Sequence, residues 1–177
     1  KKLKIMFLGG IGEIGKNMTA IEYNSDIIVI DAGMSFPNET LPGIDFVLPD
    51  ITFLKENQKK IRAIFLTHGH EDHIGGLAYV LEEINVPVYG TKMTLLLAES
   101  KLKENKINNV SLNSVSIGST VKAGCFNVEL ISVCHSITGS VALNINTPLG
   151  SVFMTGDYKL DFTPIGNEKT DLARIAE

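Results

Sequence analysis

The chain has 177 residues, of which 44% are hydrophobic and 20% charged, and its formal net charge is −4. This composition predicts one soluble globular domain with a sizeable core, and it excludes a nucleic-acid-binding domain that relies on bulk basicity. No apolar stretch approaches the roughly 20 residues that span a bilayer, and the lysine-rich start leads into a strand pattern rather than a secretory signal, so we expect no membrane partner. The two cysteines do not make a disulfide framework, which fits a cytoplasmic protein.

A short apolar strand at the start of the chain runs into a glycine-rich segment. Gly10, Gly12 and Gly15 match the G-x-G-x-x-G fingerprint of dinucleotide-binding proteins. That site needs a helix next, because the helix N-terminus holds the pyrophosphate. Residues 18–23 and 27–30 instead predict two β-strands joined by a polar turn. We therefore reject the nucleotide site and expect the glycines to form a tight loop near the active site.

Asp31 ends the second of these strands. An unpaired buried charge costs several kcal/mol, so a carboxylate at this position needs a partner. A histidine bound to a metal commonly donates its other ring nitrogen to a carboxylate. We predict that Asp31 supports a metal-bound histidine in this way. The alternative is a residue that caps the loop after the strand.

Residues 34–50 form a loop rich in proline and acidic residues. Glu39, Asp45 and Asp50, together with backbone carbonyls near Gly43, offer oxygen ligands, which predict an additional cation such as calcium. Asp50 is better placed to cap the helix predicted over the next nine residues.

Residues 67–76, with the sequence THGHEDHIGG, lie between an apolar run and a helical pattern and hold three of the four histidines. In an extended segment, residues two apart point the same way, so His68 and His70 can face one ion together. Asp72 and His73 follow on a turn that can direct them at a second point. This arrangement predicts a two-metal site, in which ions about 3.5–4 Å apart activate water. The alternative is a polar loop with solvated histidines.

The rest of the chain predicts one long helix and several short strands. The helix covers residues 92–104, with Thr91 as its cap. Its expected core stripe consists of Met93, Leu96, Leu97 and Leu102. Strands are expected at residues 86–89, 110–112, 115–117, 120–122, 126–133, 141–145 and 151–154.

Two of these strands each lead to a further metal donor. His135, the fourth histidine, follows one strand, and Asp157 follows another. The two oxygens of a carboxylate can bridge two metals, a role that we predict for Asp157 against the alternative of a turn aspartate. Cys134 faces away from its neighbour His135 in an extended chain, so we predict a core residue rather than a nucleophile.

These motifs carry a resemblance. The chain resembles the metallo-β-lactamase superfamily in its ordered set of donors, which comprises Asp31, His68, His70, Asp72, His73, His135 and Asp157. The segments GGIGEIGKNM, VIDAG, LPDI, LTHGHEDHIGG and TGDYKLD further resemble the bacterial ribonuclease J family, which belongs to the β-CASP group.

The resemblance implies a mixed α/β (α+β) fold, namely the first part of an αββα sandwich. Residues 1–177 would be the N-terminal part of a metallo-β-lactamase domain. The β-CASP domain, the C-terminal domain and a further histidine ligand would lie outside them, so these residues alone should bind metal incompletely and cleave poorly. One metal would be held by His68, His70 and His135. The other would be held by Asp72 and His73, with Asp157 bridging. The ions would be two divalent metals, zinc or manganese.

The resemblance also implies an activity. The protein would be a hydrolase that cuts RNA phosphodiester bonds as a 5′→3′ exonuclease and an endonuclease, in rRNA processing and mRNA decay. Asp72 or Asp157 would orient the attacking water or accept its proton. The substrate would be single-stranded RNA with a 5′ monophosphate, and the full-length protein would form homo-oligomers or hetero-oligomers with a paralogue. The alternatives are a hydrolase of the same superfamily that cleaves a thioester or a lactam, and a non-catalytic subunit that binds RNA or a partner nuclease.

Overall fold

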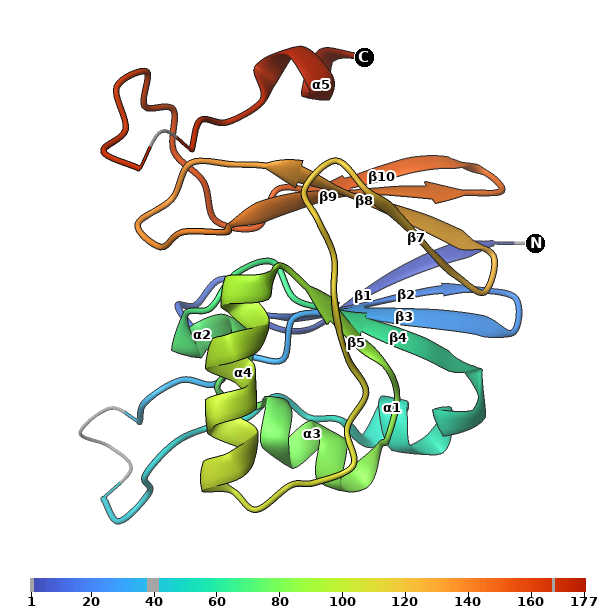
Figure 1. The fold of residues 1–177 in the computed structure, drawn as a ribbon. Coiled ribbons are helices and arrows are strands. Elements are labelled where there is room, and N and C mark those ends of the chain that lie inside the picture. The colour runs from blue at the N-terminus through green and yellow to red at the C-terminus, as the bar shows by residue number, and fades with distance from the viewer. Residues whose placement is uncertain (1, 38–41, 167) are drawn as a thin grey trace.

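The computed structural model describes residues 2–37, 42–166 and 168–177, and its strands form two sheets that face each other (Figure 1). The first sheet has the strand order β1-β2-β3-β4-β5-β6, and the second has the order β10-β9-β8-β7. The strands are β1 (Leu3–Gly9), β2 (Met18–Tyr23), β3 (Asp26–Ile30), β4 (Ile61–Phe65), β5 (Val88–Gly90), β6 (Leu112–Ser114), β7 (Thr120–Ala123), β8 (Phe126–Ser132), β9 (Val141–Thr147) and β10 (Gly150–Met154). The helices are α1 (Thr52–Glu56), α2 (Glu71–Ile74), α3 (Leu77–Glu83), α4 (Lys92–Glu104) and α5 (Leu172–Ala176), with a 3₁₀ turn η1 (Gln58–Lys60).

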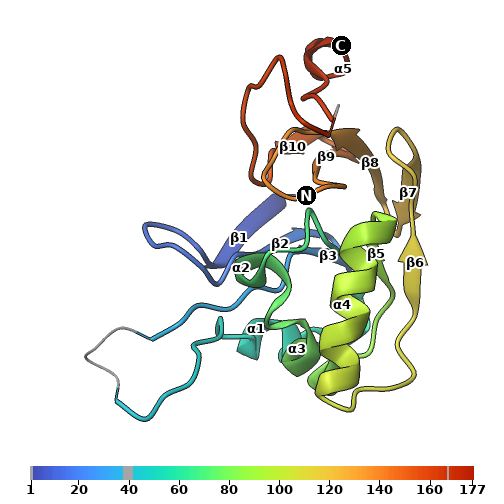
Figure 2. The same cartoon turned by 60° about the vertical axis from the view of Figure 1, so that its left-hand side comes forward.

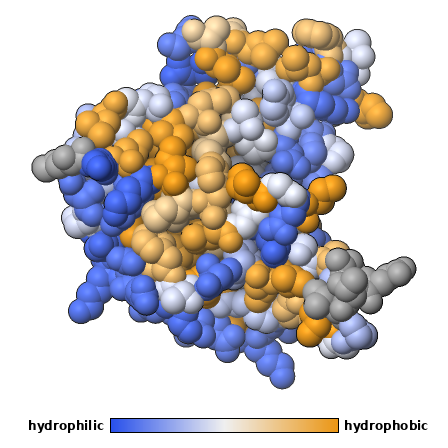
Figure 3. All heavy atoms as spheres, turned by 180° about the vertical axis from the view of Figure 1, so that it is seen from behind, coloured by the Kyte–Doolittle hydropathy of each residue, from blue (hydrophilic) through white to orange (hydrophobic). Residues whose placement is uncertain are grey.

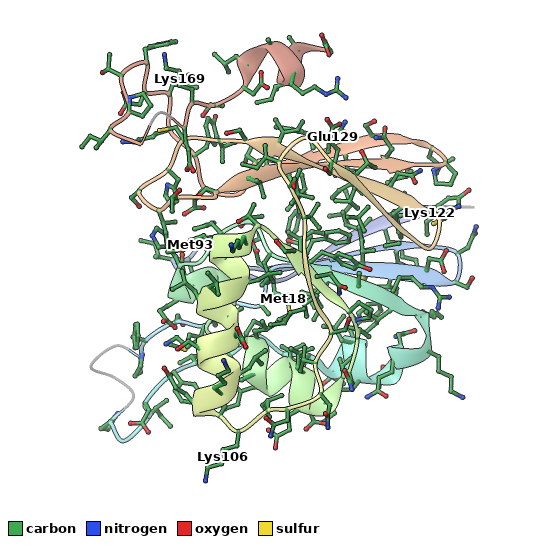
Figure 4. All side chains as sticks on the ribbon, viewed as in Figure 1. Met18, Met93, Lys106, Lys122, Glu129 and Lys169 are labelled. Carbon is green, nitrogen blue, oxygen red and sulfur yellow. The ribbon has the colours of Figure 1, made fainter. Side chains whose placement is uncertain are left out.

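The layers follow from the alternation of side chains along the strands. In β3, Ile27 and Val29 pack with the helices, whereas Ile28 and Ile30 pack against the second sheet. Helices α1, α3 and α4 cover the outer face of the first sheet, and α5 lies beyond the second (Figures 1 and 2). Figure 4 shows Met18, which belongs to the core between the first sheet and the helices. This helix–sheet–sheet–helix order confirms the expected fold class.

Most predicted elements are present, and their limits have local causes. Strand β5 starts two residues late because Pro87 has no N–H to donate to a neighbouring strand. Helix α1 is short because Asn57 donates its side-chain amide to the Phe53 carbonyl, which competes with continuation of the helix. The strand predicted at residues 115–117 is absent from the described chain, where these residues lead into a turn at Gly118 with φ +82°.

The expected core stripe of α4 is wrong in part. Leu97 packs against the core and Leu102 is buried, but Met93 and Leu96 are 38% and 52% exposed. The buried face is instead formed by Thr94, Leu95, Ala98 and Leu102. Apolar residues lie on both sides of this helix, so periodicity alone does not select the buried one.

Two predicted caps also differ in detail. Asp50 accepts a hydrogen bond from the Thr52 N–H at 2.9 Å, so its capping chemistry is confirmed, although Ile51 is the N-cap residue. Thr91 is the N-cap residue of α4, but its hydroxyl makes no cap bond and donates to the Gly139 carbonyl at 2.7 Å. This hydroxyl therefore ties α4 to the loop that follows His135.

The fold brings four strand ends to one edge of the sandwich. Strands β3 and β4 are parallel, so Asp31 and Thr67 follow neighbouring strands at the same end of the first sheet. In the second sheet, His135 follows β8 and Asp157 follows β10. The Val141 N–H donates to the Thr67 carbonyl at 3.0 Å, which joins the two sheets at this edge. Within the described residues, no helix is long and apolar enough to cross a membrane.

Candidate metal centre

Three histidine side chains from two sheets converge in a first cluster. His70 Nδ1 lies 3.1 Å from His68 Nε2 and 3.2 Å from His135 Nε2. The donor atoms of all three residues lie within 4.8 Å of one another, which a single metal ion can span. His68 is buried, while His70 and His135 are half-buried, so the cluster is open on one side. The structure thus brings together the three histidines predicted to share one ion.

A second cluster of possible donors adjoins the first and shares His68 with it. Ligand atoms of His68, His73 and Asp157 lie within 4.8 Å of one another, and Asp72 lies beside this cluster. His73 Nε2 lies 3.5 Å from Asp157 Oδ1 and 3.5 Å from Asp72 Oδ2. The other oxygen of Asp157 lies 3.8 Å from His135 Nε2. The Asp157 carboxylate therefore faces both clusters, which is the placement that a bridging ligand needs.

Asp31 and Thr67 contact the Nδ1 atoms of His68 and His73, on the opposite side of each ring from Nε2. Asp31 Oδ1 accepts the Thr67 N–H at 2.8 Å, and Asp31 Oδ2 lies 2.9 Å from the Thr67 hydroxyl and 2.7 Å from His73 Nδ1. The Thr67 oxygen in turn lies 3.0 Å from His68 Nδ1. In the tautomer that this network favours, both histidines donate from Nδ1 and leave Nε2 unprotonated, which is the form that can bind a metal.

The backbone of Asp31 also bears on its role. Its φ is +60°, in the left-handed region that costs most residues about 1–2 kcal/mol and that aspartate visits more readily. The residue is 4% exposed, and its N–H donates to the Phe65 carbonyl at 2.9 Å. A strained backbone at a buried carboxylate is typical of a functional site.

The pKa values of the histidines differ with their surroundings. Burial, followed by the neighbouring histidine charges, lowers the pKa of His68 to about 2. Burial and His70 also lower the pKa of His135. Burial alone would lower the pKa of His73, but its bond to Asp31 and the nearby carboxylates raise it. His68 and His135 are therefore neutral at pH 7, which is the form that binds metal.

Close backbone packing fixes the turn that carries Asp72 and His73. The Ala32 N–H donates to the His73 carbonyl at 2.8 Å, and the Gly76 N–H donates to the Ala32 carbonyl at 2.9 Å. A Cβ on Gly33 would lie 1.7 Å from the Asp72 carbonyl oxygen, so only glycine fits at this position. Gly76 also permits a close backbone approach, because a Cβ there would lie 2.6 Å from the Gly33 carbonyl oxygen.

A cleft of about 230 Å³ opens beside the second cluster. Gly9, Gly10 and Asn17 line this cleft, and so do His73 and Asp157. The glycine-rich loop therefore lies at the site, as expected. Hydrophobic side chains gather on the back of the molecule (Figure 3). The exposed hydrophobic residues on the edge strands β1 and β10 include Ile5, Phe7 and Phe153.

Two residues that contact the donor side chains were not predicted from the sequence. Asn17 and Thr67 contact the donor residues, and only their positions directly beside the glycine loop and His68 could have indicated them. Cys134 is 2% exposed and belongs to the core, as predicted.

The extra cation site stays a prediction. Gly43 and Asp45 are exposed, and the donor clusters found in residues 2–37, 42–166 and 168–177 do not include Asp45. Glu39, also part of that prediction, lies outside the described residues.

Comparison with known proteins identifies the family to which the chain belongs. Residues 11–158 match the metallo-beta-lactamase superfamily. Ribonuclease J of Synechocystis sp. is 46% identical over 99% of this chain and 28% of its own length. Ribonuclease J2 of Bacillus subtilis is 44% identical over 100% of this chain and 32% of its own length. The chain thus spans less than a third of these curated relatives, and the matches confirm the resemblance seen in the motifs.

A solved structure agrees at the level of the fold. The metallo-beta-lactamase fold protein YhfI from Bacillus subtilis superposes with a TM-score of 0.60 at 16% identity, over 90% of this chain and 64% of that one.

Proposed function

Because this chain belongs to the metallo-beta-lactamase superfamily, we propose that it is part of a metal-dependent ribonuclease. The reaction is hydrolysis of RNA phosphodiester bonds, both 5′→3′ from the end of the strand and internally, in RNA processing and decay. The observation that carries the proposal is the convergence of two donor clusters at one edge of the sandwich. The identity of 44–46% to proteins named ribonuclease J supports RNA as the substrate class.

The donor set fits two divalent metal ions. Imidazole nitrogens and carboxylate oxygens suit zinc, and manganese accepts the same ligands. His68, His70 and His135 would hold one ion. Asp72 and His73 would hold the other, with Asp157 between the two. Such ions, when bound, lower the pKa of water toward 7 and stabilise negative charge on a phosphoryl oxygen.

Two carboxylates would act on the attacking water, and two further residues would hold the imidazole rings. Asp72 is one-third exposed and Asp157 about half exposed, so both carboxylates are accessible to a substrate. In the proposal, one of them orients the attacking water and accepts its proton. Asp31 and Thr67 hold the imidazole rings in place, so that little reorganisation is needed during the reaction.

Other parts of the full-length protein would supply the surface that binds RNA. Residues 1–177 would form the N-terminal part of the metallo-β-lactamase domain. A β-CASP domain elsewhere would cradle single-stranded RNA and its 5′ monophosphate, because a chain with a net charge of −4 lacks the overall basicity on which binding to RNA phosphates depends. We place the protein in the cytoplasm, as a homo-oligomer or a complex with a paralogue.

The test is a comparison of substrates on the full-length protein that carries this chain. Labelled single-stranded RNA with a 5′ monophosphate should be degraded with zinc or manganese, and chelation should stop the reaction. His70→Ala should lower the rate by at least about 100-fold, because it removes a donor from the first cluster. Hydrolysis of a thioester or a lactam in place of RNA would favour another hydrolase. RNA binding without cleavage would indicate a non-catalytic subunit.

A further inference from the structure

Asn17 is a polar residue that contacts predicted metal ligands but is not itself one of them. Its side-chain Nδ2 lies 3.1 Å from the Asp72 carbonyl oxygen and 3.2 Å from Asp72 Oδ2, and it donates to both. The same nitrogen lies 3.1 Å from His73 Nε2. One amide thus contacts the carboxylate and the imidazole that are proposed to hold the second ion.

The backbone of Asn17 is held by the same segments. Its N–H donates to the Asp72 carbonyl at 3.0 Å, and its carbonyl accepts the Gly33 N–H at 2.9 Å. The Asp72 carbonyl therefore accepts from both the backbone and the side chain of Asn17. This double attachment leaves the amide little freedom to leave the site.

The glycine-rich loop explains how Asn17 reaches this position. Gly10, Gly12 and Gly15 all have positive φ, at +86°, +71° and +98°, so the chain turns back sharply after β1. A Cβ on Gly10 would lie 2.6 Å from Asn17 Oδ1, whereas a Cβ on Gly12 would meet no atom within 4 Å. Gly10 is thus the glycine whose missing side chain makes room for the Asn17 amide.

We infer that Asn17 is a positioning residue that holds the Asp72 carboxylate toward His73, and that the glycine-rich loop serves to place it. The inference rests on the proposed function, because it assigns Asn17 to the second metal cluster. The fingerprint that resembles a nucleotide site would then build part of a metal site. Outer groups that orient a ligand typically change metal affinity by 10–100-fold when they are removed.

The experiment is a cobalt titration of the full-length protein, followed by visible absorption and by calorimetry. His70→Ala, which changes only the first cluster, assigns the two binding steps. Asn17→Ala removes the amide. Asn108→Ala is the matched control, because among the described residues that side chain donates to the Lys106 carbonyl alone, and it lies outside both donor clusters. Gly10→Ala displaces the amide without removing it. Its control is Gly12→Ala, which brings similar backbone strain without the clash.

Asn17→Ala and Gly10→Ala should each weaken the second binding step by about 10-fold and leave the first step unchanged. The two control variants should bind both ions as the unaltered protein does. A second step that is unchanged in Asn17→Ala would overturn the inference, and so would an equal loss at both steps, which would indicate a general structural role. If Asn17→Ala does not fold, the two glycine variants decide the question. Equal affinities of Gly10→Ala and Gly12→Ala for the second cobalt ion would then overturn the inference. Uptake of no second ion by the unaltered protein would remove the two-metal site itself, a failure visible before any variant is compared.

Discussion

Replacement of Asp31 by asparagine is the sharpest test of how the site is supported. Asparagine has nearly the same shape and tolerates left-handed backbone, so the φ of +60° can persist. Its carbonyl oxygen can still accept the Thr67 N–H. Its NH₂ group would then face the Thr67 hydroxyl and His73 Nδ1, which lie 2.9 and 2.7 Å from Oδ2 in the native site. At His73 Nδ1 a donor would meet a donor, whereas the Thr67 hydroxyl would have to turn and accept a hydrogen bond instead of donating one.

The size of the effect follows from these contacts. His73 can restore its hydrogen bond only by moving its proton from Nδ1 to Nε2, and Nε2 is the atom proposed to bind the metal. Loss of an orienting partner of this kind costs about 10–100-fold in metal affinity, which is about 1.4–2.7 kcal/mol. The fold should persist because the backbone conformation and one of the three hydrogen bonds are kept.

The assay is zinc binding by competition with a chromophoric chelator, together with circular dichroism to verify folding. The matched control is Asp50→Asn, because Asp50 caps α1 and lies outside both donor clusters. A folded Asp31→Asn variant whose zinc affinity equals that of the unaltered protein would refute the role assigned to Asp31.

Three further predictions concern the backbone, α5 and pH. Gly33→Ala should destabilise the protein by more than about 3 kcal/mol in a denaturant titration, because its Cβ would overlap the Asp72 carbonyl; a smaller loss would contradict the packing. Arg174→Ala should lower the denaturant midpoint slightly, because its guanidinium bonds both oxygens of Glu129 at 2.8 and 2.9 Å and exposure to solvent weakens this ion pair; Glu129 lies beneath α5 (Figure 4), and an unchanged unfolding curve would show that this ion pair adds nothing. As pH falls, protons should displace the second metal before the first, because the pKa of His73 is raised and a higher pKa means stronger proton competition; simultaneous release would contradict this order.

The donor residues could be predicted from sequence because they lie shortly after the ends of strands, with Asp72 and His73 on the one-turn helix α2 that follows β4. Apolar runs marked the strands, and the polar residues after them could only lie at the edges of the sheets. The alternation of side chains in an extended segment placed His68 and His70 on one side, and the structure bears this out. The requirement that a buried carboxylate has a partner led to Asp31, which contacts His73.

Other features depend on contacts that the sequence does not encode locally. The role of Asn17 follows from a loop with three positive-φ glycines, whose path no periodicity reveals. The approach of Asp157 to both clusters depends on how the second sheet faces the first. The buried face of α4 was assigned wrongly at Met93 and Leu96, because neighbouring elements decide which apolar side is covered.

The most direct test of the account is anomalous diffraction from a zinc-loaded crystal of the full-length protein, with data on both sides of the zinc absorption edge. We expect two peaks about 3.5–4 Å apart. One should lie about 2.0–2.1 Å from ring nitrogens of His68, His70 and His135, and the other beside His73 and Asp157. Zinc bound only elsewhere on the surface, with no peak among these side chains, would contradict the metal centre and with it the proposed nuclease.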